Sequence, residues 1–354
     1  MHQIFSHQLI WIKMSLKITI ADIANALNTT PATVSRALNN DSSISEKTKL
    51  LVRETAERLN YKRNMIASSL RKGQSGFIGV IIPSAEINFF GSVVHGIESI
   101  ANSSGYNVLI FQSNESNESE IKGIETFMSA RVDGILISLS KNTTRFHHLL
   151  AAKDSNIPIV FFDRCNDDLG IHSVVIDDYK GAFMVTEHLI DQGYSRIAHI
   201  SGPNHLKIFQ ERQQGYIDAL KARNLVFHPE LIYAGDVTVE AGKKAVDYFF
   251  SLHHPPDAVF AVEDFTALGT IKALKERDIK IPEEFGVFGF ANESFGDHIT
   301  PTLSTIDQQT VLMGKESFIL LKQLMDDAEN SVVQQKIILE PILVIRKSSL
   351  KKRF

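Results

Sequence analysis

Short apolar runs rich in β-branched and aromatic residues recur from residue 77 to residue 306, alternating with amphipathic stretches. The runs are FIGVII (77–82), NVLIFQ (107–112), GILISL (134–139), PIVFFD (158–163), SVVID (173–177), RIAHIS (196–201), DAVFAV (257–262), FGVFGF (285–290) and LSTI (303–306). Because they are almost continuously apolar, they are typical of strands buried on both faces, and their alternation with helices predicts parallel sheets. One sheet seldom holds so many strands, so the pattern favours two α/β lobes.

The first part of the chain has the period of helices instead, with apolar positions three and four residues apart. Thr19 can cap a short helix whose inward face would carry Ile20, Ile23, Ala24 and Leu27. A second helix can begin with Thr30 as its cap and Pro31 at its first position, where a missing N–H costs nothing. The pair predicts a helix-turn-helix.

A third helix is predicted to begin after Ser45, which can cap it. We expect this helix to supply four residues to a small core, namely Leu50, Leu51, Ala56 and Leu59. Two short helices with a turn are common, so the spacing alone also allows a small bundle that binds only protein.

The outer face of the second helix is the one that could enter a major groove. Arg36 can donate a fork of hydrogen bonds to guanine, Ala32 can touch a thymine methyl, and Thr33 can reach a phosphate. The predicted DNA contacts of this segment are Ile20, Thr30, Pro31, Ala32, Thr33, Ser35, Arg36 and Asn39.

Charge is distributed unevenly between the two parts. Residues 14–73 hold ten Lys or Arg against five Asp or Glu, whereas the whole chain has a net charge of -4. A basic head on an acidic body indicates that only the head meets a polyanion.

Aromatic and charged residues follow several predicted strands, and ligands of such folds bind at the carboxyl ends of strands, in the crevice between lobes. Candidates at these ends are Phe89, Phe90, Asp163, Arg212, Glu263, Asp264 and Asn292. Aromatic rings that stack and charged groups that hold hydroxyls suit a sugar or a base. Structural roles remain open: the phenylalanines could be lobe core, and Asp163 or Asp264 could cap a helix.

Several classes of site are not indicated. The single cysteine, Cys165, excludes an internal disulfide and leaves too few thiols for a structural zinc site. No phosphate loop, G-x-S-x-G elbow or H-E-x-x-H motif occurs, and the pairs at 147–148 and 253–254 are expected to be solvated histidines. We therefore predict no metal, no cofactor and no catalytic residue. The single cysteine fits the reducing compartment of a cytoplasmic protein, and no apolar run approaches a membrane span, so a membrane role is not expected.

Residues 19–75 resemble the headpiece and hinge of the lactose/galactose repressor (LacI/GalR) family, and the likeness continues towards the C-terminus. The resemblance implies that residues 64–70 form a hinge helix on specific DNA and that Leu70 enters the minor groove, with Asn64 and Ala67 as further contacts. NMIASSL is too short to be a stable isolated helix, which fits folding coupled to binding. Arg63 stands where the family usually has proline.

The same resemblance implies a periplasmic-binding-protein-like body, whose effector site would match Phe89, Phe90, Asp163, Arg212, Glu263, Ala291 and Gln308. This chain departs from the family pattern at Glu263-Asp264 and at Ala291. A carboxylate is lost at one position and gained at another, so we expect an effector other than the familiar galactosides.

The predicted fold is thus an all-α helix-turn-helix headpiece joined to an α/β two-lobed sensor domain with parallel sheets. The expected boundaries are a disordered extension (1–13), the headpiece (14–62), a hinge (63–75) and the effector-binding domain (76–350). Within that domain the first lobe would hold about 76–175 and 305–335, and the second about 176–304 and 336–350.

These features together predict a sequence-specific transcriptional regulator and repressor. We expect a homodimer that binds a pseudo-palindromic operator in double-stranded DNA under the control of a sugar or sugar derivative. A transporter's solute-binding protein would share the body but has no use for a basic head. A sugar-modifying enzyme would need an acid or base pair in the cleft.

Overall fold

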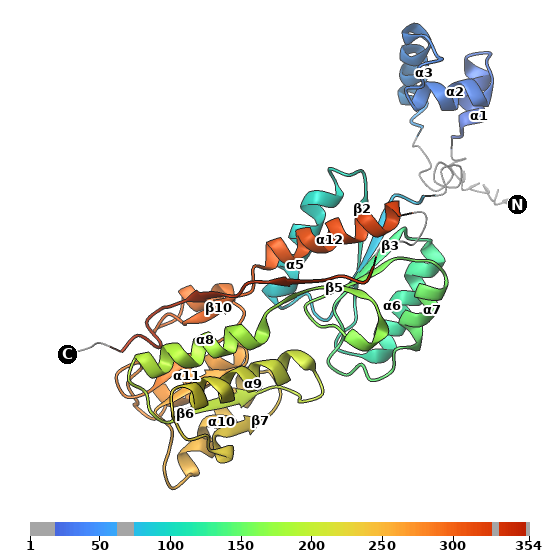
Figure 1. The fold of residues 1–354 in the computed structure, drawn as a ribbon. Helices are drawn as coiled ribbons and strands as arrows, with labels where there is room; N and C mark the ends of the chain where they lie inside the picture. The colour runs from blue at the N-terminus through green and yellow to red at the C-terminus, as the bar shows by residue number, and fades with distance from the viewer. Residues whose placement is uncertain (1–17, 62–73, 328–332, 352–354) are drawn as a thin grey trace, which may run out of the picture. The chain divides into compact units, whose positions relative to one another are not determined.

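The computed structural model describes residues 18–61, 74–327 and 333–351. Its contacts divide the chain into two compact units, residues 1–73 and residues 74–354, which we call the headpiece and the body (Figure 1). The predicted extension and most of the predicted hinge, including Asn64, Ala67 and Leu70, lie outside the described residues.

The headpiece contains the three helices that the sequence predicts: α1 (Ile20–Ala26), α2 (Pro31–Leu38) and α3 (Glu46–Arg58). Each begins after the expected residue. Thr19 forms a capping box with Asp22, and the side chains of Thr30 and Ser45 accept the backbone N–H of Thr33 and Thr48. The small core consists of Ile23, Ala24, Val34, Ala37, Val52 and Ala56.

The prediction for the inward face of α3 was partly wrong. Leu50 and Leu51 are 58% and 49% exposed, whereas Val52 and Ala56 are buried and Leu59 packs against the core. The inward-facing positions of α3 begin at Lys49 and recur every three or four residues along the helix. The Nζ of Lys49 donates to Glu46 Oε1 at 2.7 Å. An inward face at Lys49 and Val52 turns the two leucines towards solvent.

The first lobe of the body is a six-stranded parallel sheet in the order β11-β5-β4-β3-β1-β2. Helices α5 and α12 cover one face and α6 and α7 cover the other (Figure 1). The bounds are β1 (Phe77–Ile82), α5 (Asn88–Ala101), β2 (Asn107–Gln112), α6 (Asn117–Ala130), β3 (Gly134–Ile137), α7 (His147–Asp154), β4 (Ile159–Phe162), η1 (Asp167–Leu169), β5 (His172–Ile176), α12 (Thr310–Asp326) and β11 (Lys336–Leu339).

The second lobe is a four-stranded parallel sheet in the order β7-β6-β8-β9. Helices α8 and α9 pack on one face, and α10 and α11 pack on the other. The bounds are α8 (Asp178–Asp191), β6 (Ile197–Ser201), α9 (Lys207–Ala222), η2 (Pro229–Leu231), β7 (Ile232–Ala234), α10 (Val239–Ser251), β8 (Ala258–Ala261), α11 (Asp264–Lys275), β9 (Gly286–Phe288) and η3 (Ser294–Asp297).

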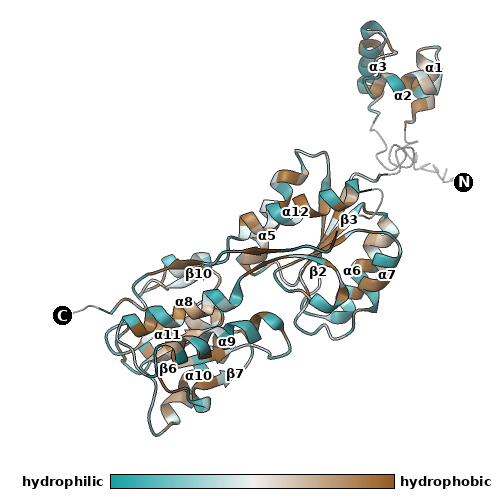
Figure 2. Ribbon diagram, viewed as in Figure 1, coloured by the Kyte–Doolittle hydropathy of each residue, from teal (hydrophilic) through white to brown (hydrophobic). Residues whose placement is uncertain are grey.

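The chain passes between the lobes after β5, between β10 (Thr305–Asp307) and α12, and between β11 and β12 (Ile342–Val344). Strands β10 and β12 pair with each other in an antiparallel ribbon. The predicted two lobes with parallel sheets are confirmed, and Figure 2 shows hydrophobic residues concentrated on the strands and on the helix faces that cover them.

The structure differs from the predicted strands in particular places. Strand β2 lies at the edge of its sheet, and Ile110 there is 55% exposed rather than buried on both faces. Strand β7 was missed because Ile232, Tyr233 and Ala234 make too short a run. Residues 336–339, expected in the second lobe, pair with β5 in the first. The chain therefore passes from the first lobe to the second only after Leu339. None of the described helices is long and apolar enough to cross a membrane.

Candidate functional site

In the headpiece, the outer face of α2 carries the residues predicted to contact DNA. Pro31, Ala32 and Arg36 are exposed, while Val34 and Ala37 on the other face are buried. The side chain of Thr30 caps the helix, accepting the N–H of Thr33 at 3.2 Å. This face combines an exposed guanidinium with small side chains that allow a close approach.

The remaining predicted headpiece contacts lie around that face with local roles as well. Asn39 is exposed and its Nδ2 donates to the carbonyl of Ser35 at 2.9 Å. Thr33 and Ser35 are half-buried. The side chain of Ile20 packs against the headpiece core, so only part of it is accessible. Whether these residues touch DNA stays a prediction.

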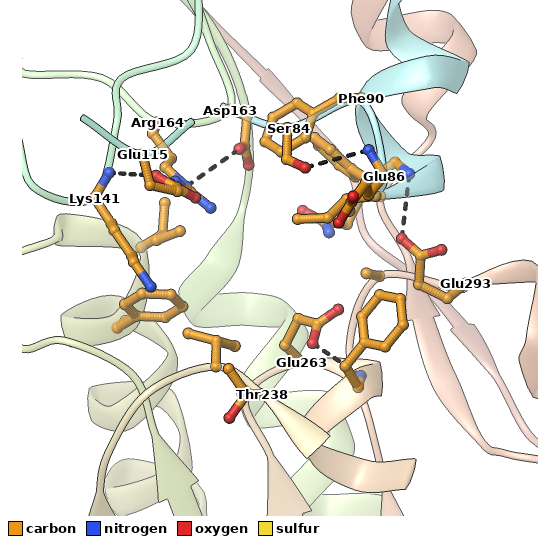
Figure 3. Close-up of a pocket in the computed structure, with 18 of the residues that line it drawn as sticks. Ser84, Glu86, Phe90, Glu115, Lys141, Asp163, Arg164, Thr238, Glu263 and Glu293 are labelled. Carbon is orange, nitrogen blue, oxygen red and sulfur yellow. Dashed lines mark hydrogen bonds and ion pairs between the residues drawn. The ribbon is translucent and has the colours of Figure 1, made fainter. Parts of the chain in front are cut away.

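The body contains a cavity of about 490 Å³ between its two lobes (Figure 3). It lies where strands of both sheets reach their carboxyl ends. The lining residues from the first lobe are Ser84, Glu86, Ile87, Phe89, Phe90, Glu115, Lys141, Asp163 and Arg164. The second lobe and the crossing segment after β10 contribute Ile208, Phe209, Arg212, Val237, Thr238, Val239, Glu263, Phe265, Ala291, Glu293 and Gln308. Its size suits a ligand such as a sugar or a nucleoside.

Seven of the nine residues predicted at the effector site, or matched to it by the resemblance, line this cavity: Phe89, Phe90, Asp163, Arg212, Glu263, Ala291 and Gln308. Asp264 and Asn292 do not. Asp264 is buried beneath the cavity, where it accepts the N–H of Glu293 at 2.7 Å and the Thr305 hydroxyl at 2.8 Å. The amide of Asn292 bonds to Asp307 and Arg346. Both side chains serve the packing of the second lobe and the crossing strands.

The aromatic wall of the first lobe combines a core role with a binding role. Phe89 and Phe90, in the first turn of α5, are 5% and 2% exposed and belong to the lobe core. They also line the cavity, with ring centroids 5.0 Å apart in an edge-to-face arrangement. A ligand would therefore meet rings whose positions are fixed by packing.

The charged group beside this wall is centred on Arg164. Its Nη1 donates to both carboxyl oxygens of Glu115 at 2.9 Å, and its guanidinium lies 5.7 Å from the centroid of the Phe90 ring. Asp163, at φ 59°, accepts from the Ser138 hydroxyl at 3.3 Å, and burial raises the pKa of its carboxyl. Glu115 was missed as a candidate, because its pairing with Arg164 joins segments 49 residues apart.

Hydrogen bonds to other residues of the protein fix the guanidinium of Arg212. Its Nε donates to Asp178 Oδ1 and its Nη1 to the carbonyl of Val262, both at 2.7 Å, and Nη2 lies 3.4 Å from Gln308 Oε1. The guanidinium stacks 3.7 Å from the centroid of the Phe290 ring and is 3% exposed. Arg212 thus ties together α8, the end of β8 and the crossing segment after β10, at the base of the cleft.

Carboxyl groups dominate the side of the cleft opposite Arg164. Glu263 caps α11, with Oε2 accepting the N–H of Phe265 at 2.8 Å, and Glu293 Oε1 accepts the N–H of Phe89 at 3.2 Å. The second contact reaches across the cleft, because Phe89 lies in the first turn of α5 in the first lobe. It supplies an acceptor to a helix whose N-cap residue, Ile87, has no capping side chain. Burial raises the pKa of both carboxyls, and for Glu263 the neighbouring Asp264 raises it further.

Burial also raises the pKa of Asp264 to about 7, against a value near 3.8 in the absence of the fold. The unfolded chain therefore releases this proton at a lower pH than the folded protein does, so the free energy of unfolding falls as pH rises from about 4 to 7. A shift of about three units corresponds to at most about 4 kcal/mol. In urea unfolding at pH 5 and pH 8, we expect Asp264→Asn to lose less stability with rising pH than the wild type. An equal loss in both proteins would assign the effect to other groups.

Lys141 belongs to a loop after β3, and buried hydrogen bonds hold this loop in place. Glu120 is buried and accepts from the backbone N–H of Ser140 at 2.8 Å, while its other oxygen lies 2.9 Å from His148 Nε2. The expectation that both histidines at 147–148 are solvated was therefore wrong for His148, which is 3% exposed. Helix α7 buries it against α6, and the buried pair fixes the loop that presents Lys141. No cluster of three potential metal ligands occurs within the described ranges.

The comparisons with known proteins agree with this arrangement. Residues 75–340 match the family described as periplasmic binding proteins and sugar binding domain of LacI family, and residues 19–64 match bacterial regulatory proteins, lacI family. The transcriptional repressor CytR of Escherichia coli (strain K12) is 32% identical over 309 residues, covering 87% of this chain and 90% of CytR. The transcriptional repressor PurR of Vibrio vulnificus is 30% identical over 328 residues, covering 93% and 97%.

A crystal structure of the Lac repressor dimer bound to operator and the anti-inducer ONPF matches with a TM-score of 0.84 and 26% identity, covering 94% of this chain and 99% of that one. Both the helix-turn-helix headpiece and the two-lobed body are therefore shared with solved regulators. The chain belongs to the LacI family of bacterial regulatory proteins.

Proposed function

We propose that the protein is a cytoplasmic transcriptional repressor that binds a pseudo-palindromic DNA operator as a homodimer and whose operator affinity is set by a small carbohydrate-like ligand in the cleft of the body. The observation that carries this proposal is the presence in one chain of an exposed recognition face on α2 and a cavity of ligand size between two lobes. The related Lac repressor was crystallised as a dimer on its operator together with an anti-inducer.

The headpiece supports a DNA partner over a protein partner. Helix α2 presents Ala32 and Arg36 outwards, and its N-terminus is free of acidic side chains. Exposed Lys47, Arg53 and Arg58 on α3 add positive charge to the same small unit. A short helix with an exposed arginine and small neighbours fits a major groove, and the surrounding basic residues suit phosphates.

The body supports a small-molecule signal. Parallel strands of two sheets end at one cleft, and segments that cross between the lobes lie beside it. A ligand that contacts both lobes binds one of their relative arrangements better than another, and that difference is the free energy available to a second site. A transporter's solute-binding protein would use the same cleft but has no role for the headpiece. No catalysis is part of the proposal.

The test for the headpiece is selection of binding sites from a pool of randomised duplex DNA, followed by anisotropy titrations of the full chain. We expect enrichment of a pseudo-palindrome and expect Arg36→Ala to relax base preference at one symmetric position, by about 1–3 kcal/mol per contacted base pair. Arg58→Ala removes the same charge from α3 and should leave base preference intact. If Arg36→Ala instead weakened binding equally on every sequence, Arg36 would be only a phosphate contact.

A further inference from the structure

The basic side chains of the cleft already face protein carboxylates. Arg164 donates to both oxygens of Glu115, and Arg212 donates to Asp178 Oδ1 at 2.7 Å. Lys141 Nζ lies 3.7 Å from an oxygen of Asp236. A phosphate or carboxylate on the ligand would have to compete with these carboxylates for the same cationic groups.

The carboxylates of Glu263 and Glu293 are in the opposite situation. Within the described ranges, neither has a lysine, arginine or histidine nitrogen within ion-pair distance; their partners are backbone N–H groups. One oxygen of Glu263 accepts the N–H of Phe265, and the carboxyl group points into the cavity (Figure 3). No hydrogen bond to a described residue occupies its other oxygen. That oxygen is an acceptor available to a ligand.

The helix ends compensate these charges only in part. Glu263 stands at the N-terminus of α11 and Glu293 at that of α5, and a helix N-terminus carries about half a positive charge. When both carboxyls are ionised, the two helix ends therefore leave about one negative charge uncompensated. Asp264, buried directly behind, disfavours this ionised state of Glu263. A positive charge on the ligand would stabilise it.

We propose that the ligand of the cleft carries a protonated amine beside hydroxyl groups, as an amino sugar does, and that the free carboxyl oxygen of Glu263 binds this ammonium. This inference rests on the proposed function, because it names the ligand class of the same cleft. Phe265, two residues after Glu263, also lines the cavity and is an aromatic side chain of the kind that attracts cations, while Ser84, Thr238 and Gln308 offer polar partners to hydroxyls.

The protonation of Glu263 gives this mode of binding a signature. Burial and the adjacent Asp264 raise the pKa of Glu263, and an ammonium bound beside the carboxyl would lower it again. Binding of an amine should therefore favour loss of the Glu263 proton, so that protons are released at any pH where this carboxyl of the empty cleft is still partly protonated. A neutral hydroxyl ligand at the same place would not.

The experiment compares matched probes on the full-length protein: glucosamine, glucose and glucose 6-phosphate, and the corresponding galactose and mannose series. Thermal shift at millimolar ligand comes first, and calorimetry in two buffers of different ionisation enthalpy follows for each compound that stabilises. We expect at least one amine to raise the melting temperature more than its hydroxyl and phosphate counterparts, with proton release. If the hydroxyl or phosphate members stabilise equally well, or no amine stabilises, the proposal is overturned.

Glu263→Gln locates the effect. The amide can still accept the N–H of Phe265 but carries no charge, so the dissociation constant of the amine should rise by about 10- to 100-fold. Glu240→Gln, an exposed position in the first turn of α10 outside the lining, removes the same charge and should change it less than twofold. An unchanged constant in Glu263→Gln overturns the assignment.

Two precautions keep the outcomes separate. If Glu263→Gln melts too low to assay, Glu263→Asp retains the cap on α11 and withdraws the carboxylate by one methylene, and it should also weaken the amine. Stabilisation by a neutral or phosphorylated sugar that equals or exceeds that by the matching amine would overturn the amine class while leaving the proposed regulator intact. Failure of the proposed function itself would appear elsewhere, as the absence of any selected DNA sequence.

Discussion

Arg212→Ala is expected to lower the free energy of unfolding of the body by about 3–5 kcal/mol. The guanidinium and the Asp178 carboxylate are 3% and 2% exposed as side chains, so removing Arg212 leaves a buried carboxylate without a counter-charge. The Val262 carbonyl loses a 2.7 Å hydrogen bond at the same time. Urea unfolding monitored by circular dichroism measures the loss directly.

The matched control lies at the end of the same helix. Arg223, at the C-terminus of α9, pairs with Asp191 and Glu187 at the surface, with its side chain 37% exposed. Exposed pairs contribute little, so Arg223→Ala should cost less than about 1 kcal/mol. Similar losses in the two variants would show that Arg212 does not hold the base of the cleft. Because of this structural role, loss of ligand binding in Arg212→Ala would not by itself locate the ligand.

Gly314→Ala is expected to destabilise the first lobe by about 3 kcal/mol or more, since overpacking against backbone has no easy relief. A β-carbon on Gly314 of α12 would lie 2.1 Å from the carbonyl oxygen of Val93 on α5. The contact is reciprocal, because a β-carbon on Gly96 of α5 would lie 2.2 Å from the carbonyl oxygen of Val311 on α12. The two helices therefore contact through their backbones, and neither can accept a methyl group without separating.

Gly91→Ala provides the control for the effect of glycine itself. Gly91 lies in α5, is exposed, and a β-carbon there would meet nothing within 4 Å. Alanine is the better helix former by about 0.5–1 kcal/mol, so this variant should be as stable as the wild type or more stable. Melting temperatures of the two variants distinguish a steric effect at Gly314 from a general one. A stable Gly314→Ala protein would contradict the close helix contact.

The local signals of the headpiece could be predicted from the sequence. Thr19, Thr30 and Ser45 precede helices because their side chains satisfy the first free N–H groups, a property of a few neighbouring residues. The inward face of α3 was harder, because Leu50 and Leu51 are as apolar as core residues yet point outwards. The hydrophobicity of the two leucines therefore predicted the wrong inward face for α3. The rotation of the helix about its axis decides which residues pack against the core.

The strands of the body were predictable where burial is continuous and not where it is partial. FIGVII and NVLIFQ match β1 and β2 at both ends, but the edge position of β2 depends on which strands pair across the sheet. Residues 336–339 were expected in the second lobe. The pairing of β11 with β5 joins segments that are far apart in the chain, and no local pattern indicates it.

The candidate site divides in the same way. The rule that ligands bind beyond the carboxyl ends of strands led to Phe89, Asp163 and Glu263, which line the cleft. The rule could not predict that Glu263 lines the cleft while Asp264 is buried in the lobe. The two residues are adjacent at the start of a helix, and only the folded structure decides which side chain faces the cavity. Glu293 was missed as a candidate, since its contact with Phe89 spans 204 residues. The charge balance of the cleft followed only from such distant pairs.

Control of DNA binding by the cleft is the central claim, and one titration tests it most directly. The affinity of the full-length protein for its selected duplex is measured by anisotropy without ligand and with a saturating amount of whichever probe sugar stabilises the body most. We expect a change in the dissociation constant of about 5- to 150-fold, with an equal reciprocal change in ligand affinity when DNA is present. An unchanged dissociation constant at saturating ligand would contradict control of the headpiece by the cleft.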